Sequence, residues 1–486
     1  MKEFEKKLIS TSAKENLAYI KAVLAQNGDI VFREFSFDGR NAVIIYIDGM
    51  ADKLLLDEYV IQPLMQHEDD KISSEEVFNT VVTASDVRKV DDMTKGINAF
   101  LSGDTLMFID NLTEAYVIAT RSWPNRGVGQ AENEATIKGS KEGFTETIRF
   151  NTALVRRRVR DTRFKLIPYV FGERSKSDAC IMYIDDIVNK KALKLLQKRL
   201  ANIDIDAILD SSYIEHLIED NINSPFPQIQ MTERPDVVAA ALYEGRIALI
   251  VDNSPYAIIV PATLPNFFQS PDDYYERWLN SSLVRLVRFM AILISLAMPA
   301  LYVAITSYHS AIIPTKLAYS IAASREGVPF PAFLEVMIME FSMAILLEAI
   351  VRLPKAIGAT IGIVGGLIIG QSAVSAGLVS PIMIIVISLT TITTFITPNY
   401  DVVTALRLCR IFLVIASSIL GLYGLMMGLM LILIHLIKLE SFGTAYLAPM
   451  VNPNIRDFKD MYIKLPLKYF KDRPKYMKTP DKYRQK

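Results

Sequence analysis

The sequence predicts an α/β soluble region of two related subdomains, followed by an all-α polytopic membrane domain. Three observations lead to this fold class. Residues 1–285 carry many charges of both signs, whereas apolar runs dominate from Phe289 to Ile437. A pair of apolar motifs recurs within the charged half. One apolar stretch, Ala356–Leu378, has a glycine at every fourth position.

The change in composition sets the expected division of the chain. The 486 residues are enough for two or three domains and a membrane part. The N-terminus has no apolar core of signal-peptide length, so we expect the first half to stay in the cytosol. We predict related α/β subdomains at 1–140 and 141–280, a transmembrane domain at 281–440 and a basic cytosolic tail at 441–486.

The repeat in the soluble half consists of two matching pairs of segments. Ala42–Asp48 (AVIIYID) is identical to Ala179–Asp185 (ACIMYID) at five of seven positions. Leu101–Asn111 parallels Tyr243–Asn253, and both end in Asp-Asn. The offsets of 137 and 142 residues indicate a duplicated module with a small insertion.

Each copy is expected to run strand, helix, helix and then a hairpin of two strands. The first strand lacks strict alternation, which is typical of a strand buried on both faces. Amphipathic helices follow at Leu54–Met65 and Lys191–Ala201. The Asp-Asn pairs could be metal ligands, but Asp and Asn more often stabilise turns. We therefore interpret them as turn residues.

The segment between the copies is rich in arginine. Such a cluster could bind nucleic acid or anionic lipid headgroups. The interpretation that we favour is a helix that forms salt bridges with a neighbouring domain or subunit. Nucleic-acid binding is not expected, since interleaved aromatic residues and strong net basicity are absent. The six arginines are Arg149, Arg156, Arg157, Arg158, Arg160 and Arg163.

Positive charges predict the topology of the apolar half. The last 49 residues hold 12 Lys or Arg against 5 Asp or Glu, and Arg277, Arg285 and Arg288 precede the first apolar run. Basic flanks favour the cytoplasmic side, so both ends should lie there and the number of crossings should be even. The candidate segments are Phe289–Tyr308, Ala332–Val351, Ala356–Gly377, Val379–Thr397 and Ile411–Ile437.

Five candidates conflict with an even number, so one should be re-entrant or interfacial. We assign this role to Ala332–Val351, because Glu335, Glu340 and Glu348 are costly in lipid. Four full spans result. Glu340 and Glu348 could attract cations beside a pathway, although Glu348 also has the spacing to pair with Arg352.

The glycine helix provides the candidate functional residues. Small residues at helical spacing let membrane helices pack closely, so the glycines form the predicted packing face. The opposite face is polar at both ends and apolar between them, as expected of a pore wall or a shared interface. The alternative is buried packing without a lumen. The packing residues are Gly358, Gly362, Gly366 and Gly370, and the pore or gate candidates are Thr360, Val364, Leu367 and Gln371.

The sequence gives no sign of catalysis. None of its four histidines has metal-ligand spacing to another His or Cys, and there is no phosphate-binding loop, HExxH or GxSxG motif. We therefore expect no enzyme, no cofactor and no metal site. Cys180 and Cys409 lie far apart, so a structural disulfide is not expected.

Two blocks of sequence resemble the A subunits of bacterial spore germinant receptors, the GerA family. One block contains SPFPQIQMTERPD at 224–236 and SPDDYYERW at 270–278. The other runs from Arg352 to Gln371 and is followed by SFG at 441–443. The resemblance extends over nearly all of residues 28–466. Ala344 and Leu347 depart from it, because relatives usually have a Glu and an Arg there.

The resemblance implies a role in the spore inner membrane. It implies two α/β subdomains before a membrane domain, a homo-oligomeric ring of five copies, and cation release when germinant binds. It also implies a transporter-like B subunit and a lipoprotein C subunit as partners, with lipid around the membrane part. Two alternatives stay open: an auxiliary protein of the same superfamily in the dipicolinic-acid release machinery, and a non-conducting scaffold subunit.

Overall fold

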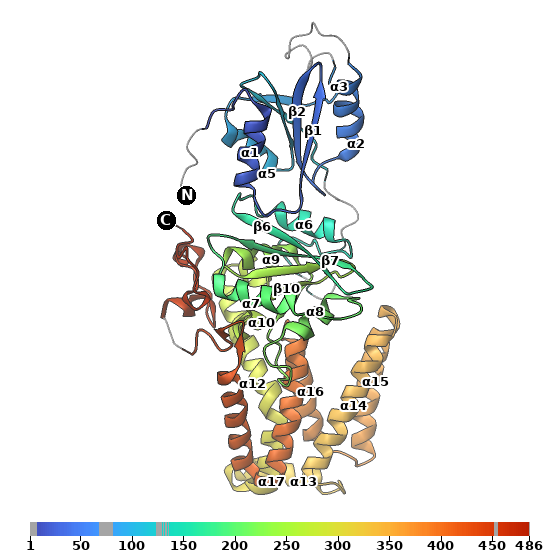
Figure 1. Ribbon diagram of the computed structural model, residues 1–486. Helices are drawn as coiled ribbons and strands as arrows, with labels where there is room; N and C mark the ends of the chain where they lie inside the picture. Colours follow the sequence, from blue (N-terminus) through green and yellow to red (C-terminus); the bar gives the residue numbers. More distant parts are fainter. Residues whose placement is uncertain are drawn as a thin grey trace.

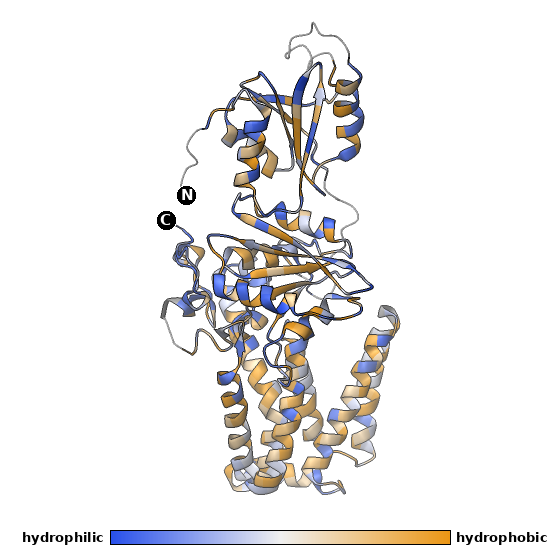
Figure 2. Ribbon diagram, viewed as in Figure 1, coloured by the Kyte–Doolittle hydropathy of each residue, from blue (hydrophilic) through white to orange (hydrophobic). Residues whose placement is uncertain are grey.

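The computed structural model describes residues 7–67, 81–122, 129, 131, 134, 136–451 and 455–485. Two α/β units and a helical bundle are stacked in chain order, and the C-terminal segment lies beside the second unit (Figure 1). Hydrophobic residues dominate the helices of the bundle, whereas hydrophilic and hydrophobic residues alternate in the α/β units (Figure 2). The division in composition is therefore a division in architecture.

Each α/β unit contains a five-stranded antiparallel sheet. The first sheet has the order β1-β2-β4-β5-β3 and the second has the order β6-β7-β9-β10-β8, so the two sheets have equivalent topology. The strands of the first are β1 (Ile30–Phe37), β2 (Arg40–Ile47), β3 (Val87–Val90), β4 (Thr105–Ile109) and β5 (Ala115–Ile118). Those of the second are β6 (Phe164–Phe171), β7 (Ser177–Ile184), β8 (Gln230–Thr232), β9 (Ile247–Val251) and β10 (Ala257–Val260).

Helices cover both faces of each sheet. In β2, Val43 and Ile45 pack into one apolar cluster while Ala42 and Ile44 pack into the other. The lack of alternation in this strand is thereby explained, since both of its faces are buried. The first unit contains α1 (Ala13–Val23), α2 (Lys53–Leu56), the π-helix η1 (Asp57–Ile61), α3 (Gln62–Gln66) and α5 (Met93–Leu101); the second contains α6 (Ile148–Arg156), α7 (Lys190–Ala201), α8 (Ser211–Ile218) and α9 (Pro235–Tyr243).

The two Asp-Asn pairs occupy equivalent turns, as the turn interpretation predicts. Asn111 and Asn253 have positive φ angles of 69° and 64°, a conformation that Asn tolerates better than most residues. The backbone N–H of Ala13 donates to Asp110 at 2.8 Å and lowers the pKa of that carboxyl group. In the second unit, the backbone N–H of Ile148 donates to Asp252 at 2.9 Å. Each aspartate thus stabilises the start of a helix.

The helical half follows a short linker. The linker contains α10 (Leu264–Phe268) and α11 (Asp272–Tyr275). The bundle contains α12 (Trp278–Tyr308), η2 (Ser310–Ile312), α13 (Thr315–Arg325), α14 (Ala332–Arg352), α15 (Lys355–Ser375), α16 (Pro381–Phe395) and α17 (Tyr400–Lys438). The C-terminal segment has β11 (Glu440–Ser441), β12 (Thr444–Ala445), η3 (Ile455–Asp460), η4 (Leu467–Tyr469) and η5 (Lys475–Met477). In the described residues, α12 and α17 are long and apolar enough to cross a membrane, and α15 and α16 contain shorter apolar helices.

The expectation of one straight span at Ile411–Ile437 is wrong, because α17 turns back on itself. Gly421 takes φ 60° and ψ −138°, which are not helical angles. A Cβ at Gly424 would lie 2.1 Å from the carbonyl oxygen of Ala416, so the turn requires glycine there too. The arms 400–420 and 422–438 are therefore separate helices that pack side by side.

The segment expected to be re-entrant or interfacial forms the helix α14. It is continuous over 21 residues, about 31 Å at 1.5 Å per residue. The cost of its acidic residues was the reason for treating it as interfacial, and the structure pairs all three of them with arginines. In the described residues, the bundle thus contains six longer helices of 15 to 31 residues, namely α12, α14, α15, α16 and the two arms of α17, where the sequence suggested four spans and one partial segment.

Candidate functional site

The glycine helix α15 packs against α14 through glycine, and the two form a hairpin at one side of the bundle (Figure 1). A Cβ at Gly358 would lie 3.1 Å from the carbonyl oxygen of Ile350, and one at Gly362 would lie 3.2 Å from Ile350 Cδ1. At Gly365 the distance to Leu346 Cδ1 would be 2.8 Å. These three glycines let the two helices approach closely.

The predicted packing face is only partly correct. Among the described residues, a Cβ placed at Gly366 would have no neighbour within 4 Å beyond the adjoining residues and backbone of its own helix. Gly365, and not Gly366 as predicted, makes the contact with α14. A Cβ at Gly370 would lie 3.8 Å from Ile384 of α16, an ordinary contact. The face is therefore centred on Gly358, Gly362 and Gly365. Successive spacings of four and three residues keep these glycines on one face of a helix with 3.6 residues per turn, whereas repeated spacings of four drift around the helix.

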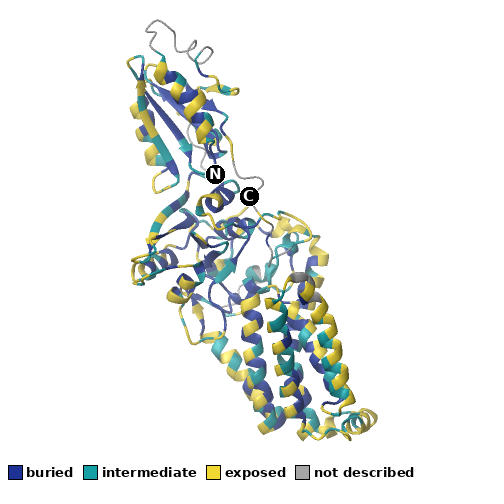
Figure 3. Ribbon diagram, turned by 90° about the vertical axis from the view of Figure 1, so that its right-hand side faces the viewer, coloured by how far each residue is buried: buried dark blue, intermediate teal, exposed yellow. Residues whose placement is uncertain are grey.

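The four pore or gate candidates lie together on the opposite side of α15. At 100° per residue, Thr360, Val364, Leu367 and Gln371 fall within an arc of about 60°, diametrically opposed to the packing glycines. All four are exposed; Val364 is 47% and Leu367 66% exposed. Much of the outer surface of the bundle is similarly exposed (Figure 3). An apolar helix face of this kind requires lipid or another protein chain to cover it.

Glu335 anchors the far end of the hairpin. Its carboxylate is fully buried, 3.0 Å from Arg325 of α13, and accepts a hydrogen bond from the backbone N–H of Ser380 at 2.9 Å. Ser380 caps α16 and contacts Tyr302 of α12 at 3.2 Å. A single carboxylate thus connects α13, α14 and α16. This is a packing role, and Glu335 does not face the exposed side of α15.

Glu340 belongs to a second buried network. It accepts a hydrogen bond from Arg410 of α17 at 2.9 Å, and both side chains are nearly inaccessible. Arg410 also donates to Thr394 of α16 at 3.1 Å, and Thr394 contacts Ser295 of α12 at 2.9 Å. Four helices meet at this pair. Glu340 is therefore neutralised by a partner, and we do not assign it to cation attraction.

The third acidic residue, Glu348, pairs along its own helix. It accepts hydrogen bonds from Arg352 at 2.8 and 2.6 Å, as the i, i+4 spacing predicts, and both side chains are exposed. Ala344 and Leu347, which lie between these charges in sequence, line a cavity of about 20 Å³ beside Glu340 and Arg410. The acidic residues of α14 are thus all paired.

A buried charge cluster joins the linker to α12. Arg285 and Arg288, which flank the first apolar run, both contact Asp273 of α11, at 2.9 and 3.0 Å. Arg285 also donates to Asp460 of the C-terminal segment at 2.7 Å, and Lys464 donates to the carbonyl oxygen of Asp273. Besides favouring a cytosolic position, these arginines therefore fix the start of α12.

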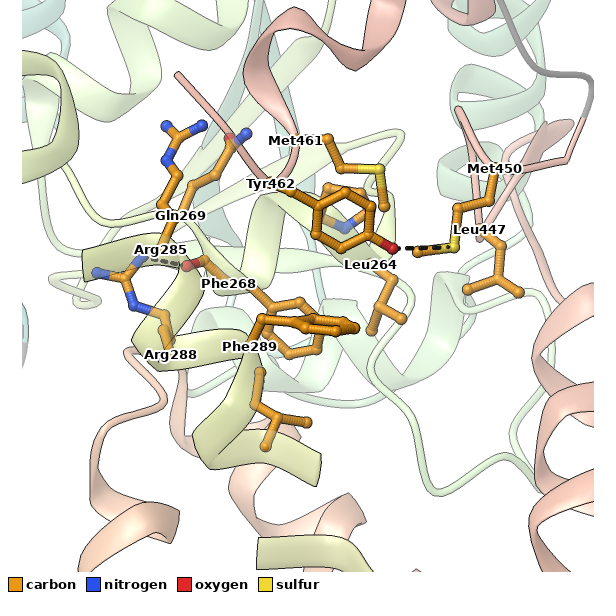
Figure 4. Close-up of a pocket in the computed structure, with 12 residues that line it drawn as sticks. Leu264, Phe268, Gln269, Arg285, Arg288, Phe289, Leu447, Met450, Met461 and Tyr462 are labelled. Carbon is orange, nitrogen blue, oxygen red and sulfur yellow. Dashed lines mark hydrogen bonds between the residues drawn. The ribbon is translucent and has the colours of Figure 1, made fainter. Parts of the chain in front are cut away.

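An apolar pocket of about 80 Å³ lies beside this cluster (Figure 4). Phe268 and Phe289 form part of its wall, while the guanidinium groups of Arg285 and Arg288 lie at one edge (Figure 4). The backbone carbonyl of Phe268 accepts a hydrogen bond from Arg288 at 2.5 Å. The pocket is part of the packing between linker, α12 and C-terminal segment.

The arginine-rich segment forms salt bridges within the chain, as the favoured interpretation predicted. Arg156 of α6 donates to both carboxylate oxygens of Asp29, at 2.6 and 2.7 Å, and is 1% exposed. This pair connects the second α/β unit to the first. The remaining contacts are Arg149 with Asp48, Arg157 and Arg158 with Glu142, Arg160 with Ser102, and Arg163 with Asp161 and Asp186.

Comparison with known proteins places this architecture in a family. The family described as Bacillus/Clostridium GerA spore germination protein matches residues 18–476. The chain belongs to the GerA family of spore germination proteins. Its relatives include the uncharacterized membrane protein YfkQ of Bacillus subtilis, which is 41% identical over 94% of the chain and 90% of YfkQ.

Two further relatives of this GerA-family chain are named for spore germination. GerLA of Bacillus cereus is 39% identical over 96% of both chains, and spore germination protein B1 of Bacillus subtilis is 39% identical over 98% of the chain and all of B1. The crystal structure of the N-terminal domain of the A subunit of the Bacillus megaterium spore germinant receptor GerK3 covers 54% of the chain and 99% of that domain, with 35% identity and a TM-score of 0.43. The names of these relatives are not those of enzymes.

Arg410 is the residue of this buried network that the sequence analysis missed. An arginine inside an apolar helix is a strong signal, because an unpaired charge in lipid is costly. The same reasoning drew attention to the glutamates of α14 but did not look for their partners. A search of the apolar segments for arginines that could neutralise the three glutamates of α14 would have identified Arg410.

Acidic groups also gather where α8 meets the start of α17. Burial raises the pKa of Glu215 to about 8, and the nearby charge of Asp401 adds to the effect. Burial likewise raises the pKa of Glu219 to about 7. In the described residues, no group of three or more His, Cys, Asp or Glu is arranged to hold a metal ion. Burial thus favours the protonated forms of Glu215 and Glu219.

Proposed function

We propose that this chain is the A subunit of a spore germinant receptor and that copies of it surround a cation pathway in the spore inner membrane. The observation that carries the proposal is the exposed face of α15. Its centre, Val364 and Leu367, is apolar and uncovered within the described chain, and its ends, Thr360 and Gln371, are polar. A ring of such helices would give a path with polar mouths and an apolar constriction.

The constriction supplies a mechanism for the closed state. A ring of aliphatic side chains excludes water from a narrow path, and an ion cannot cross a dry segment without losing its hydration. Germinant binding would open the path by turning or separating the α15 helices. Along the contact with α14, three positions of α15 are glycines, which reduces the side-chain interdigitation that such a movement would have to break.

The assembly in this proposal is a homo-oligomer, a pentamer by family resemblance. A transporter-like B subunit and a lipoprotein C subunit would be its partners, and membrane lipid would cover the remaining apolar surface. The proposal involves no enzymatic reaction, cofactor or nucleic acid. In this proposal the domains end at residues 140, 280 and 440, and the two α/β units form the base of the ring.

The proposed orientation places the α/β units and the C-terminal segment in the cytosol. Asn189 donates to the carbonyl oxygen of Met477 at 3.1 Å, and Arg473 donates to that of Tyr243 at 2.9 Å. The C-terminal segment therefore lies on the same side of the bundle as the second α/β unit. Its basic composition favours the cytoplasmic face. Crossing of the membrane by all six of these helices would satisfy the requirement for an even number.

A non-conducting scaffold is the second candidate, because the same exposed face suits contact with lipid. The two functions are separated by Leu367→Ala in spores, with potassium release followed in the absence of germinant. Ile345→Ala is the matched control, since Ile345 is a similarly exposed aliphatic residue on α14. Spontaneous release from Leu367→Ala alone supports the channel. Normal dormancy and a normal germinant response in both variants would favour the scaffold or an auxiliary role in dipicolinic-acid release.

A further inference from the structure

The first three turns of α12 have an inverted distribution of side chains. Their buried face carries Arg285 and Arg288, whereas their exposed face is apolar. On that face Leu279, Leu283 and Leu286 are 65%, 63% and 57% exposed. A helix beside water normally turns its charged residues outward and its leucines inward. An exposed apolar face of this kind marks a surface that another molecule covers.

The length of α12 places these leucines beyond the lipid core. The far end of the helix lies beside the reversal in α17, because Tyr308 donates to the carbonyl oxygen of Ser418, three residues before Gly421. From Tyr308 to Trp278 the helix rises about 45 Å at 1.5 Å per residue, whereas the hydrocarbon core of a bilayer is about 30 Å thick. About ten residues, 278–287, therefore extend past the hydrocarbon core toward the α/β units.

Polar contacts surround the same turns on their buried side. Ser281 donates to the carbonyl oxygen of Asp273 in the linker at 2.7 Å, and Ser282 donates to that of Lys464 in the C-terminal segment at 3.1 Å. At 100° per residue, Ser281 lies roughly 140–160° around the helix from each of the three leucines. The linker and the C-terminal segment thus leave the leucine face uncovered. A protein surface, and not lipid, must cover it.

A second exposed apolar surface lies on α8. Tyr213 and Leu217 are one turn apart on its outer face and are 42% and 49% exposed, and Ile222 beyond the helix is 79% exposed. The leucine face of α12 is exposed as well, so neither surface covers the other within one chain.

The two surfaces lie at the same height above the bundle. Asp401 at the start of α17 is close enough to Glu215 of α8 to contribute to the raised pKa of that carboxyl group. Asp401 lies 20 residues, or about 30 Å, along α17 from the reversal at Gly421. Leu286 lies 22 residues, or about 33 Å, along α12 from Tyr308 at the same reversal.

The charges beside the two surfaces are opposite. Arg277 directly precedes α12 and is exposed, and Glu219 directly follows α8. Among the residues that the structure describes, neither forms an ion pair. Two different surfaces of opposite charge suit a heterologous contact, in which each copy offers one surface to the neighbour on either side, and such contacts close into rings.

We propose that the leucine face of α12 in one copy of this chain packs against α8 of the next copy. The inference rests on the homo-oligomer of the proposed function and names the surfaces that join its subunits, but it does not depend on ion conduction. Because the contact lies outside the lipid core, the removal of apolar surface from water favours it.

The test is disulfide cross-linking of the full-length protein in native membranes, where Cys180 and Cys409 are buried. Cysteine at Leu279, Leu283 or Leu286 is combined in turn with cysteine at Tyr213 or Leu217, since a disulfide requires Cβ atoms about 3.5–4.5 Å apart and the set covers neighbouring registers. On oxidation we expect at least one double variant to form dimers and a ladder of higher multimers, because each copy supplies a cysteine to both neighbours. The single variants, and Leu283→Cys combined with Ile345→Cys on α14, should stay uncross-linked.

Lysine-reactive cross-linking of the same membranes reports whether the chain is oligomeric at all. An oligomer in which no double variant forms a disulfide overturns the proposed contact and leaves the homo-oligomer standing, whereas a monomer overturns both. Cross-linking of an α12 single variant would assign the leucine face to a contact between like helices and would also overturn the proposal.

Charged substitutions provide a second measurement. Leu283→Lys and Leu217→Glu should each weaken self-association at least tenfold, because each leaves an unpaired charge in an apolar contact. The two substitutions in one chain should recover part of the loss, since the charges then face each other. Ile345→Lys is the matched control and should leave association unchanged. Undiminished association of both single variants would overturn the proposal.

Discussion

The buried pair of Arg156 and Asp29 should be a principal connection between the two α/β units. Arg156 and Asp29 have 1% and 8% of their side chains exposed, and they share two hydrogen bonds of 2.6 and 2.7 Å. Arg156 also donates to Asn27 at 2.9 Å and lies over the ring of Phe164. The perturbation that we choose is Arg156→Met, which keeps the length of the side chain and removes its charge.

The expected loss follows from the burial of the remaining carboxylate. Removing one partner of a buried ion pair costs about 3–5 kcal/mol, because the other charge stays desolvated. For a unit of this size, each kcal/mol corresponds to roughly 2–4 °C in the unfolding temperature. We therefore expect the α/β region of Arg156→Met to unfold roughly 6–20 °C below the wild type.

The assay is circular dichroism of the full-length protein in detergent, with Arg149→Met as the control. Arg149 lies on the same helix and also contacts the first unit, 3.6 Å from Asp48, but its side chain is 66% exposed. Such a surface pair contributes about 0–1 kcal/mol. Equal shifts in the two variants, or a shift of Arg156→Met below about 3 °C, would refute the reasoning from burial.

Three further outcomes are expected. Gly365→Leu should destabilise the protein by about 1–3 kcal/mol more than Gly366→Leu, because only Gly365 faces Leu346 and a larger side chain there overpacks the contact. The measurement is the unfolding temperature in detergent, and a lower temperature for Gly366→Leu would contradict the observed helix packing. Glu340→Gln should destabilise the protein by more than about 2 kcal/mol and Glu348→Gln by less than about 0.5 kcal/mol, since only the first pair is buried; equal melting temperatures would refute this. Stability should fall as the pH rises from about 5 to 8, because burial raises the pKa of Glu215 to about 8 and the folded state then holds a proton that the unfolded state releases. Glu215→Gln should flatten that pH profile, and an unchanged slope would exclude Glu215 as its source.

Much of the α/β architecture could be predicted from the repeat. The strands at Ala42–Asp48 and Ala179–Asp185 are β2 and β7, and their continuous apolar character reflects burial on both faces. The sequence did not reveal β1 and β6, the edge strands that pair with them. Half of an edge strand faces solvent, so its pattern is mixed, and β6 contains Pro168, which argues against a strand unless it lies at an edge.

The membrane half was harder to predict, because hydropathy shows how apolar a segment is but not where the chain reverses direction. The run at Ile411–Ile437 is apolar except for Ser417, Ser418 and His435, yet Gly421 reverses the chain within it. Hydropathy also penalised α14 for its glutamates, although arginines on α13, α14 and α17 pair with them. The pair of Glu340 and Arg410 joins helices 70 residues apart in sequence, and hydropathy carries no information about such a contact. The exposed face of α15, in contrast, followed directly from helical periodicity.

Water access to Leu367 tests the central claim most directly. The measurement is the reaction of Leu367→Cys with a charged, membrane-impermeant thiol reagent after germinant is added, with Ile345→Cys as the control. A thiol reacts as the thiolate, which forms in water and not in lipid, and the native Cys180 and Cys409 are buried. A water-filled pathway predicts rapid modification at position 367 and little at 345. Equal protection of both positions would place the α15 face against lipid or protein and contradict the channel.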